Sequence, residues 1–498
     1  MAIPKDILAV ARPKNTFVVA YGKDKDRYAV RKYVGCRYDK GRHIPIKGPT
    51  VGHIVGGRFV ESDDIAAVSG AKCRAELKEW ASAQLCEKVF SSVIPDLERH
   101  YSRKDALRLY SLAVLRVCNP GMKDYEAKER YETSFLSEFH QGVSLSKNKV
   151  SDFMSGLGKA YPRIVAFMRD RAKKVKASDH VLVDGTLKTD TSTVNTLSDF
   201  SRKARVKGCR DISVLYAYNL AEREPICSKC YPGNMLDLTA VDDFLAENRI
   251  TEGLLVMDKG FPSGATEKHR AANPKLHFLN PVKRNSKYVE THHLLDFDGV
   301  LKDREGVTYR KAKVNGQEKW LYAYRDARRA AAEEAAYLAN AKKEGRYSHA
   351  EHARKRKFFG VIVLESDVDL TFEDAYRAYE ERWEIELVMR FYKSACEFDD
   401  TRVHSDYSVL GSEFCDFLAS LLTFKLIKAF DKAGVLKDMT YSRAMALLRR
   451  AKKIKLDGEW RLIKINPAVE RLLGTLDLLP KADKLPARGV GRPRKAIV

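Results

Sequence analysis

Three carboxylates have the surroundings that a metal site needs. Asp184 and Asp258 each stand near the end of a short apolar run, HVLVDG (180–185) and LLVMDKG (254–260), and Glu386 lies in a helical pattern. Such runs are typical of strands buried on both faces of a sheet, and α/β sheets present ligands where their strands end. Carboxylates that converge from separate elements bind hard divalent cations, and two such ions promote phosphoryl transfer. We therefore expect one metal site, although strand-terminal aspartates also occur without metal.

Glu386 belongs to a helix with a charged stripe. Thr371, followed three residues later by Asp374, predicts the start of this helix, and no Pro or Gly interrupts it before Phe398. At about 100° per residue, five residues fall within a sector of roughly 80°: Tyr379, Arg382, Glu386, Arg390 and Lys393. Apolar residues cover most of the remaining surface, so the stripe is expected to line something charged. The alternative is an ion-pair ladder within the helix, because Arg382, Glu386 and Arg390 are spaced at intervals of four.

The composition indicates an acidic partner. The 498 residues include 90 Lys and Arg against 67 Asp and Glu, which gives a formal net charge of +23. An excess of this size is the electrostatic footprint expected of a protein that binds nucleic acid. The sequence has no run of 18 apolar residues and no signal-peptide core, so a soluble cytoplasmic protein without a membrane partner is expected.

Periodicity predicts strands and then helices in the first third of the chain. Short strands are expected at Phe17–Tyr21, Tyr28–Tyr38 and His53–Val60. Lys and Arg alternate with Tyr there, which suits either contact with a DNA backbone or an ordinary solvated surface. Helices are expected to follow as far as residue 176. The helix over Ser144–Gly158 is either the second helix of a helix-turn-helix or a packing helix.

From residue 177 the pattern predicts an α/β domain with an interruption. Strands in series, followed by strands alternating with helices, are typical of this class. Residues 286–357 break the alternation, and Val307–Tyr324 is expected to form a hairpin within them. The sheet is expected to resume at Phe359–Leu364, and amphipathic helices at Ser408–Phe430 and Ser442–Lys453.

The spacing of the charged stripe resembles a known signature. Tyr379-x2-Arg382-x3-Glu386-x6-Lys393 is similar, at all four positions, to the Y-(2)-R-(3)-E-(6)-K signature of bacterial insertion-sequence DDE transposases of the IS-four superfamily. The segments VDGT (183–186) and MDKGF (257–261) are similar to the strands that carry the first and second Asp of that family. The resemblance covers residues 177–430, and the N-terminal region looks most like the IS1634-type branch.

The resemblance implies a fold, a cofactor and an activity. It implies an RNase H-like core that binds two Mg²⁺ or Mn²⁺ ions through Asp184, Asp258 and Glu386. The residues expected to contact DNA are Tyr379, Arg382, Arg390 and Lys393. Cut-and-paste DNA transposition is then expected: water attacks at the end of the element, and the freed 3′-OH attacks target DNA. The implied partners are inverted repeats and target DNA, bound by a homodimer in a synaptic complex within a bacterial, nucleoid-associated setting.

Two other functions stay open. An RNase H-like nuclease without mobility would keep the fold and the metal site. A non-catalytic DNA-binding or architectural protein would keep only the affinity for DNA, and the presence of all three acidic residues argues against it. A nicking assay with divalent metal separates an enzyme from a binder.

With the resemblance included, the chain is expected to have seven parts. They are a β-rich domain that could bind DNA ends (1–62), a helical DNA-binding or linker region (63–176), two parts of the RNase H-like core (177–285 and 358–435), an insertion (286–357), a C-terminal helical region (436–480) and a basic tail (481–498). The predicted fold class is α/β, with a mixed sheet flanked by helices and a β-rich insertion.

The tail carries a second candidate DNA-binding motif. Arg488, Arg492, Pro493 and Arg494 belong to a segment that resembles an AT-hook. The Gly-Arg-Pro core of such a motif lies in the narrow minor groove of A·T-rich DNA, where the potential is strongly negative. A generic basic tail is the alternative.

Overall fold

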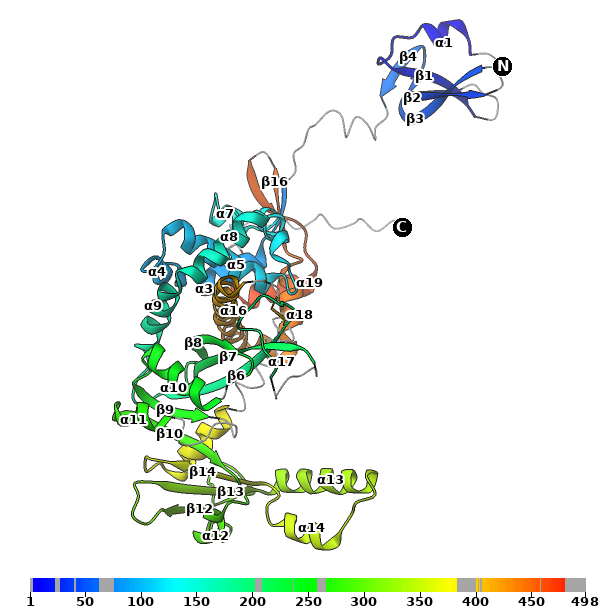
Figure 1. The fold of residues 1–498 in the computed structure, drawn as a ribbon. Coiled ribbons are helices and arrows are strands. Elements are labelled where there is room, and N and C mark those ends of the chain that lie inside the picture. Colours follow the sequence, from blue (N-terminus) through cyan, green and yellow to red (C-terminus); the bar gives the residue numbers. More distant parts are fainter. Residues whose placement is uncertain are drawn as a thin grey trace, which may run out of the picture. The chain divides into compact units, whose positions relative to one another are not determined.

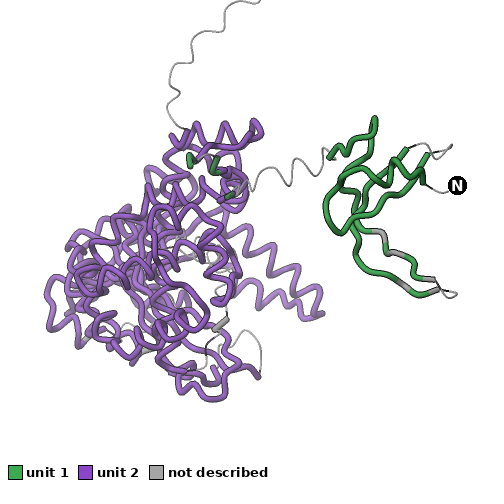
Figure 2. Tube along the Cα trace, turned by 90° about the horizontal axis from the view of Figure 1, so that it is seen from above, with its two compact units in different colours: residues 1–76, 455–459 green, residues 77–454, 460–498 purple. Residues whose placement is uncertain are grey.

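Two compact units make up the chain. The computed structural model describes residues 3–22, 27–39, 42–61, 76–201, 208–235, 237–257, 266–382, 400–401, 403, 405–456 and 458–479. Unit 1 is Met1–Glu76 with Lys455–Glu459, and unit 2 is Leu77–Ile454 with Trp460–Val498 (Figure 2). Each unit has its own hydrophobic core, which is small in unit 1 and joins helices to a large sheet in unit 2.

The described residues of unit 1 up to Glu61 form a four-stranded antiparallel sheet with one short helix. Its elements are α1 (Lys5–Ala9), β1 (Thr16–Tyr21), β2 (Arg27–Asp39), β3 (Arg42–Val55) and β4 (Arg58–Glu61), and the strands pair in chain order. Val18, Val30 and Ile54 form its core. The prediction of one strand over His53–Val60 is wrong, because Gly56 and Gly57, at φ of 56° and 73°, turn the chain between β3 and β4.

The N-terminal part of unit 2 is helical from Ala81 on, as predicted, whereas Glu76–Glu79, within the region predicted to be helical, form strand β5. Its helices are α3 (Ala81–Phe90), α4 (Val93–Glu98), α5 (Arg103–Cys118), η1 (Asp124–Glu126), α6 (Ala127–Glu132), α7 (Leu136–Phe139), α8 (Lys147–Lys159) and α9 (Tyr161–Ala172). Several of them pack around α16 (Asp406–Lys432), which is buried along most of its length (Figure 1). No helix in the described part of the chain combines the length and the apolar character needed to cross a membrane.

The crossing of α8 and α16 explains why α8 is a packing helix. A Cβ atom on Gly158 would lie 1.9 Å from the carbonyl oxygen of Tyr407, and one on Gly411 would lie 2.1 Å from that of Met154. The two backbones therefore approach each other as closely as only glycine allows. Of the two interpretations of Ser144–Gly158, this contact favours the packing helix.

A mixed sheet forms the centre of unit 2. Its first five strands occur in the spatial order β8 (Glu224–Pro232), β7 (Arg210–Asn219), β6 (His180–Asp190), β9 (Glu252–Met257) and β10 (Lys275–Val282). β7 is antiparallel to both neighbours, whereas β9 is parallel to β6 and to β10. Helix α10 (Asp237–Asn248) stands between β8 and β9 in the chain, and α11 (Glu267–Ala271) stands between β9 and β10. This is the RNase H-like strand order, and the predicted fold class is confirmed.

The insertion continues the same sheet beyond β10 (Figure 1). The strands beyond β10 follow in the order β14 (Val361–Ser366), β13 (Trp320–Asp326), β12 (Val307–Lys313) and β11 (Gly299–Val300), all antiparallel, and the last three belong to the insertion. It also contains α12 (Lys287–Thr291), α13 (Ala327–Lys343) and α14 (His349–Arg356). The predicted hairpin and the predicted return to the sheet are both confirmed.

The C-terminal part adds short helices and a small sheet. Its elements are α17 (Val435–Asp438), α18 (Tyr441–Leu448), β16 (Lys452–Leu456), β17 (Glu459–Leu462) and α19 (Pro467–Thr475). β16 lies between β17 and β5 (Glu76–Glu79) in a three-stranded sheet. The helix predicted over Ser442–Lys453 is too long, because the alternating residues after Leu448 form β16, and Gly458, at φ of 87°, suits the turn that follows.

Candidate metal site and its surroundings

Asp184 lies within β6, at the place where the parallel pairing ends. β6 and β9 pair from His180 with Leu254 to Val183 with Met257, whereas β6 and β7 pair as far as Asp190 with Arg210. The prediction that Asp184 stands at a strand end is therefore wrong for the strand itself, because the antiparallel ladder carries β6 six residues further. The prediction holds for the side of β6 that pairs with β9, because Asp184 directly follows the last parallel pair, Val183 with Met257.

The Asp184 carboxylate is half-buried and accepts a hydrogen bond from the backbone. The Gly185 amide donates a hydrogen bond to Asp184 Oδ1 at 2.8 Å, and Gly185 itself is exposed. A carboxylate in such a position is accessible to a cation and to a strand of DNA, and carboxylate oxygen is the ligand that hard divalent cations prefer. The residue therefore fits the role of a metal ligand.

Several of the predicted site residues lie outside the described residues. Asp258 falls in the range 258–265, and Glu386, Arg390 and Lys393 fall in 383–399. The tail residues do so as well: Arg488, Arg492, Pro493 and Arg494. Within the described ranges, no group of three His, Cys, Asp or Glu side chains could hold a metal ion.

The helix that the sequence predicts from Thr371 is present over residues 372–382. The Asp374 amide donates to Thr371 Oγ1 at 3.0 Å, and the Thr371 hydroxyl donates to the Asp374 carboxylate at 2.7 Å, which confirms the predicted start. The Tyr324 hydroxyl on β13 donates to the Phe372 carbonyl at 2.8 Å. Nine residues after Phe372, Glu381 Oε2 lies 3.2 Å from His180 Nδ1 at the start of β6. The helix thus joins the insertion to the strand that carries Asp184.

Tyr379 and Arg382 lie together on the inner face of this helix. Their exposed fractions are 7% and 5%, and the Arg382 guanidinium lies 5.0 Å from the centre of the Tyr379 ring. Arg329 of α13 approaches the same tyrosine: burial lowers the Arg329 pKa, but a hydrogen bond to Glu333 and the closeness of Tyr379 raise it above its ordinary value. The structure therefore brings these two predicted residues into one cation–π pair, with Arg329 beside it.

A buried ionic cluster contains Lys188, which lies on the same face of β6 as Asp184 and follows it by four residues. Lys188 Nζ is 2.6 Å from Glu413 Oε2 and 2.8 Å from Asp416 Oδ2, both on α16. Arg116 of α5 lies 2.7 Å from the other Asp416 oxygen. All four side chains are less than 10% exposed. The cluster therefore holds α5, α16 and the strand that carries Asp184 in one fixed arrangement.

Burial and pairing act in opposite directions on these charges. Burial lowers the pKa of Lys188, but Asp416 and Glu413 outweigh burial and raise that pKa above its ordinary value. Burial raises the pKa of Glu413, and the attraction of Lys188 only partly offsets the rise. Each ionised group therefore depends on its partners, and removing one of them leaves a buried charge without compensation.

Two tyrosines of β7 border Asp184 on the side of α16. Tyr216 is opposite Asp184 in the antiparallel register, and its ring lies 5.7 Å from that of Tyr218 and 6.5 Å from that of Phe417. Burial, with smaller contributions from Tyr216 and from the negative charge of Asp184, raises the pKa of Tyr218 well above its ordinary value. Asp184 is thus bordered on one side by an enclosed aromatic surface.

The sequence analysis did not predict any residue of this ionic cluster as functional. One signal for it does exist, because Glu413 and Asp416 stand three residues apart in an otherwise apolar stretch of α16. Lys188 and Glu413 are separated by 225 residues, so no local pattern could have paired them.

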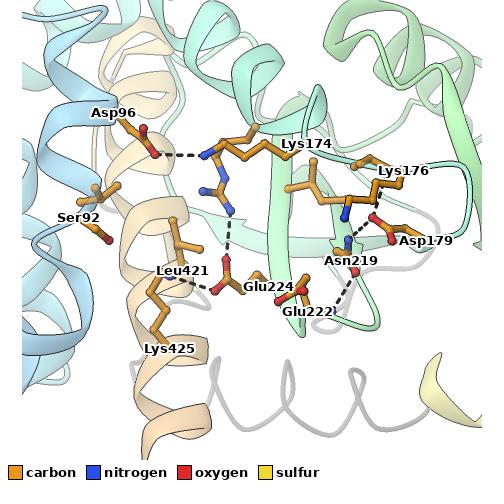
Figure 3. Close-up of a pocket in the computed structure, with 14 residues that line it drawn as sticks. Ser92, Asp96, Lys174, Lys176, Asp179, Asn219, Glu222, Glu224, Leu421 and Lys425 are labelled. Atoms are coloured by element: carbon orange, nitrogen blue, oxygen red, sulfur yellow. Dashed lines mark hydrogen bonds and ion pairs between the residues drawn. The ribbon is translucent and has the colours of Figure 1, made fainter.

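A separate polar pocket lies between α4, α9, α16 and the turn that joins β7 to β8 (Figure 3). Its volume is about 510 Å³, and its lining does not include Asp184, Tyr379 or Arg382. The ion pairs at its walls are Lys174 with Asp96 at 3.4 Å, Arg171 with Glu224 at 3.7 Å, and Lys425 with Glu224 at 3.0 Å. Because the cations and anions of its lining pair with one another, this pocket has no excess of positive charge that would attract DNA.

The central segment of the chain is similar to a known family of domains. Residues 176–409 match the family model described as a transposase DDE domain. The matched segment, slightly under half of the chain, begins just before β6 and ends within α16, so it holds the sheet, the insertion and the helix over 372–382. This segment is therefore similar to transposase DDE domains, which agrees with the predicted resemblance at that level. The individual insertion-sequence branch stays a prediction.

One solved structure gives a weaker similarity. It is the cryo-EM structure of the piggyBac transposase synaptic complex with hairpin DNA, with 10% sequence identity and a TM-score of 0.38. The alignment covers 74% of this chain and 79% of that one. A search of curated proteins gives no match.

Proposed function

We propose that this chain is a DDE transposase that cleaves DNA at the ends of its element and joins the freed ends to target DNA. The observation that supports this most is the parallel register of β6 and β9, whose last pair is Val183 and Met257. The sequence continues from that pair into Asp184 on one side and Asp258 on the other. We infer that these two carboxylates are neighbours and form two thirds of the metal site.

Glu386 would supply the third carboxylate. Glu381 reaches His180 at the start of β6, and His180 and Asp184 share one face of that strand because they are an even number of residues apart. Glu386 follows Glu381 by five residues in a sequence without Pro or Gly. The helix over 372–382 therefore contacts the strand that carries Asp184, and its sequence leads on to Glu386.

Two Mg²⁺ or Mn²⁺ ions, when bound by these carboxylates, would activate the attacking oxygen and stabilise the leaving one. The protein's own contribution is to hold Asp184 at a fixed place. The Lys188 cluster fixes the far part of β6 against α16, and Tyr216 fixes the neighbouring strand through its packing on Phe417. A preorganised carboxylate needs little rearrangement when the metal and the DNA arrive.

The charged stripe would bind the phosphates of double-stranded DNA. Arg382 is stacked on Tyr379, so its guanidinium is already oriented, and a planar guanidinium can donate two hydrogen bonds to one phosphate. Arg390 and Lys393 would extend the contact along the same helix. The tail residues Arg488 to Arg494 would add a contact in an A·T-rich minor groove, and a homodimer would bring two ends together.

The test is metal-dependent nicking of supercoiled plasmid DNA by the full chain. Asp184→Asn keeps the shape of the side chain and an oxygen that can accept from Gly185, so it should fold but nick about 10³-fold more slowly or worse. Asp298→Asn, at an exposed aspartate of the insertion, is the control and should nick as the wild type does.

Three outcomes would decide between the functions. Near-normal nicking by Asp184→Asn would show that the metal site lies elsewhere. Nicking without any joining of 3′ ends to target DNA would favour an RNase H-like nuclease without mobility. DNA binding by the wild type without nicking in Mg²⁺ or Mn²⁺ would favour the non-catalytic DNA-binding protein.

A further inference from the structure

Unit 1 contains a two-stranded ribbon, residues 33–39 of β2 and 42–49 of β3, that extends beyond the rest of its sheet. β1 pairs with β2 only as far as Lys32, and β4 pairs with β3 only from Gly52 to Val55. Apart from a hydrogen bond from the Tyr33 amide to the Asn15 carbonyl, the described residues of the two ribbon strands pair only with each other (Figure 2). Seven residues of strand correspond to about 23 Å. The ribbon is therefore an arm, not a part of the small core.

The ribbon exposes large apolar side chains on both of its faces. The exposed fractions are 43% for Tyr33, 63% for Val34, 70% for Tyr38, 36% for Ile44 and 46% for Ile46. A two-stranded hairpin is only marginally stable in water, and it gains nothing from leaving such side chains in solvent. Their exposure on an arm indicates a surface that contacts a partner.

One face of the ribbon is ordered by its own side-chain contacts. Tyr38 and His43 are opposite each other in the register, and their ring centres lie 5.0 Å apart. Cys36 Sγ lies 3.6 Å from His43 Nδ1, and a hydrogen bond to Cys36 raises the pKa of Tyr33. The aromatic row is thus arranged before any partner binds, which lowers the entropy cost of binding.

The positive charge of this segment indicates an acidic partner. Residues 27–49 contain seven Lys and Arg but only one acidic residue, Asp39. Lys32, at the base of the ribbon, is exposed. Cations interspersed with Tyr and Ile suit duplex DNA, because cations bind phosphates while aromatic and aliphatic side chains contact base edges.

The width of the ribbon indicates which groove of duplex DNA it fits. Two strands lie about 4.8 Å apart, and with their side chains they match the major groove, which is about 12 Å wide, better than the minor groove of about 6 Å. Register shifts between Val30 and Gly35 mark irregular pairing at the base of the ribbon. Such bulges increase the twist of a ribbon, which helps it to follow a groove.

We infer that the β2–β3 ribbon binds in the major groove of duplex DNA. The inference rests on the proposed function, which supplies DNA as the partner. It adds the element that binds, the ribbon, and the groove that the ribbon enters. Lys32 at the base contacts the phosphates beside the groove, while Tyr38 and Ile46 reach toward the base pairs from opposite faces of the ribbon.

The test measures the binding of the full chain to a mixed-sequence duplex of about 30 base pairs, long enough for the ribbon's groove contacts and for flanking phosphates. The double variant Tyr38→Ala with Ile46→Ala should bind about tenfold more weakly and should lose protection of guanine N7, an atom of the major groove. Lys32→Gln should lower the log–log salt slope by about 0.9. Tyr347→Ala, at a tyrosine of the insertion that is 51% exposed, is the control and should change neither quantity.

The inference fails if the double variant binds as the wild type does with the same N7 protection, or if the protection that it loses lies on minor-groove atoms. It also fails if the variant changes the self-association of the chain but not its affinity for DNA. These outcomes are distinct from a failure of the proposed function, because that function fails when the wild type does not nick DNA, whatever the ribbon binds. A wild type that nicks, with a ribbon variant that binds normally, would refute the ribbon alone.

Discussion

The Lys188 cluster and the β2–β3 ribbon use similar cationic residues in opposite ways. In the cluster, Lys188 and Arg116 are enclosed and held against carboxylates at 2.6–2.8 Å. At the base of the ribbon, Lys32 is exposed, and exposed Tyr, Val and Ile side chains follow along the strands, beyond the small core of unit 1. The comparison teaches that burial against carboxylates commits Lys188 and Arg116 to the architecture, whereas exposure leaves Lys32 available to a polyanion.

The energetics of the two regions differ for the same reason. Desolvation makes each buried ion costly unless its partner is present, so breaking one pair costs several kcal/mol. An exposed cation is solvated with or without a partner, and its removal changes stability by about 0.5 kcal/mol or less. Substitutions in the cluster should therefore change folding, and substitutions in the ribbon should change binding.

The largest effect is expected from Lys188→Met. It leaves Glu413 and part of Asp416 buried without a cation, so the free energy of unfolding should fall by about 3–5 kcal/mol. Chemical denaturation of the full chain measures it. Lys128→Met, in an exposed pair with Glu132 at 3.8 Å, is the control and should cost about 0.5 kcal/mol or less.

The double variant Lys188→Met with Glu413→Gln separates lost pairing from lost packing. It removes one cation and one anion, while Arg116 still neutralises Asp416. Most of the lost stability should return. If the double variant were as unstable as Lys188→Met, the cluster would owe its contribution to packing and the comparison with the ribbon would break.

The single variant Lys188→Met should also show a pH dependence of known sign. Without Lys188, burial holds the folded-state pKa of Glu413 above its unfolded value, so the folded state binds more protons than the unfolded state. The variant should therefore lose stability as the pH rises from about 4.3 through that raised pKa, by about 1.4 kcal/mol for each pH unit between the unfolded and folded pKa values. Denaturation from pH 4.5 to 8 should show the deficit relative to the wild type growing with pH, and a constant deficit would contradict the prediction.

A smaller effect is expected at the crossing of α8 and α16. Gly158→Ala would place a methyl group 1.9 Å from the Tyr407 carbonyl oxygen, so the helices must separate, at a cost of about 1–3 kcal/mol. Gly156→Ala, on the same helix with open space around it, should instead stabilise the protein by about 0.5–1 kcal/mol. Melting temperatures of the two variants give the comparison, and equal shifts would show that α8 is not fixed by this contact.

The smallest change in stability is expected on the ribbon. Tyr38→Ala with Ile46→Ala removes side chains that no core encloses, so the free energy of unfolding should change by about 0.5 kcal/mol or less. In contrast, Lys188→Met at a temperature where it is folded should keep the salt slope of DNA binding. A ribbon variant that unfolded unit 1 would show that these side chains serve folding instead.

Much of the fold followed from local patterns. Apolar runs predicted the strands around Asp184 and before Asp258, and the Thr371 cap predicted the start of the helix that bears Tyr379 and Arg382. Errors arose where glycine or alternation was misjudged, as at Gly56 and Gly57 and after Leu448. Asp184 proved to lie inside its strand, because the length of a strand depends on which neighbours pair with it.

The sequence by itself determined the types of residue that could bind metal and DNA, and the spacing of the charged stripe, because helix and strand periodicity are local. Only the tertiary structure decided that Val183 and Met257 end the same parallel ladder and that Lys188 meets Glu413 and Asp416. It also decided that no third strand among the described residues pairs along the ribbon. These facts depend on pairing between residues far apart in the chain, and such pairing is set by the packing of the whole core, which no local window of sequence contains.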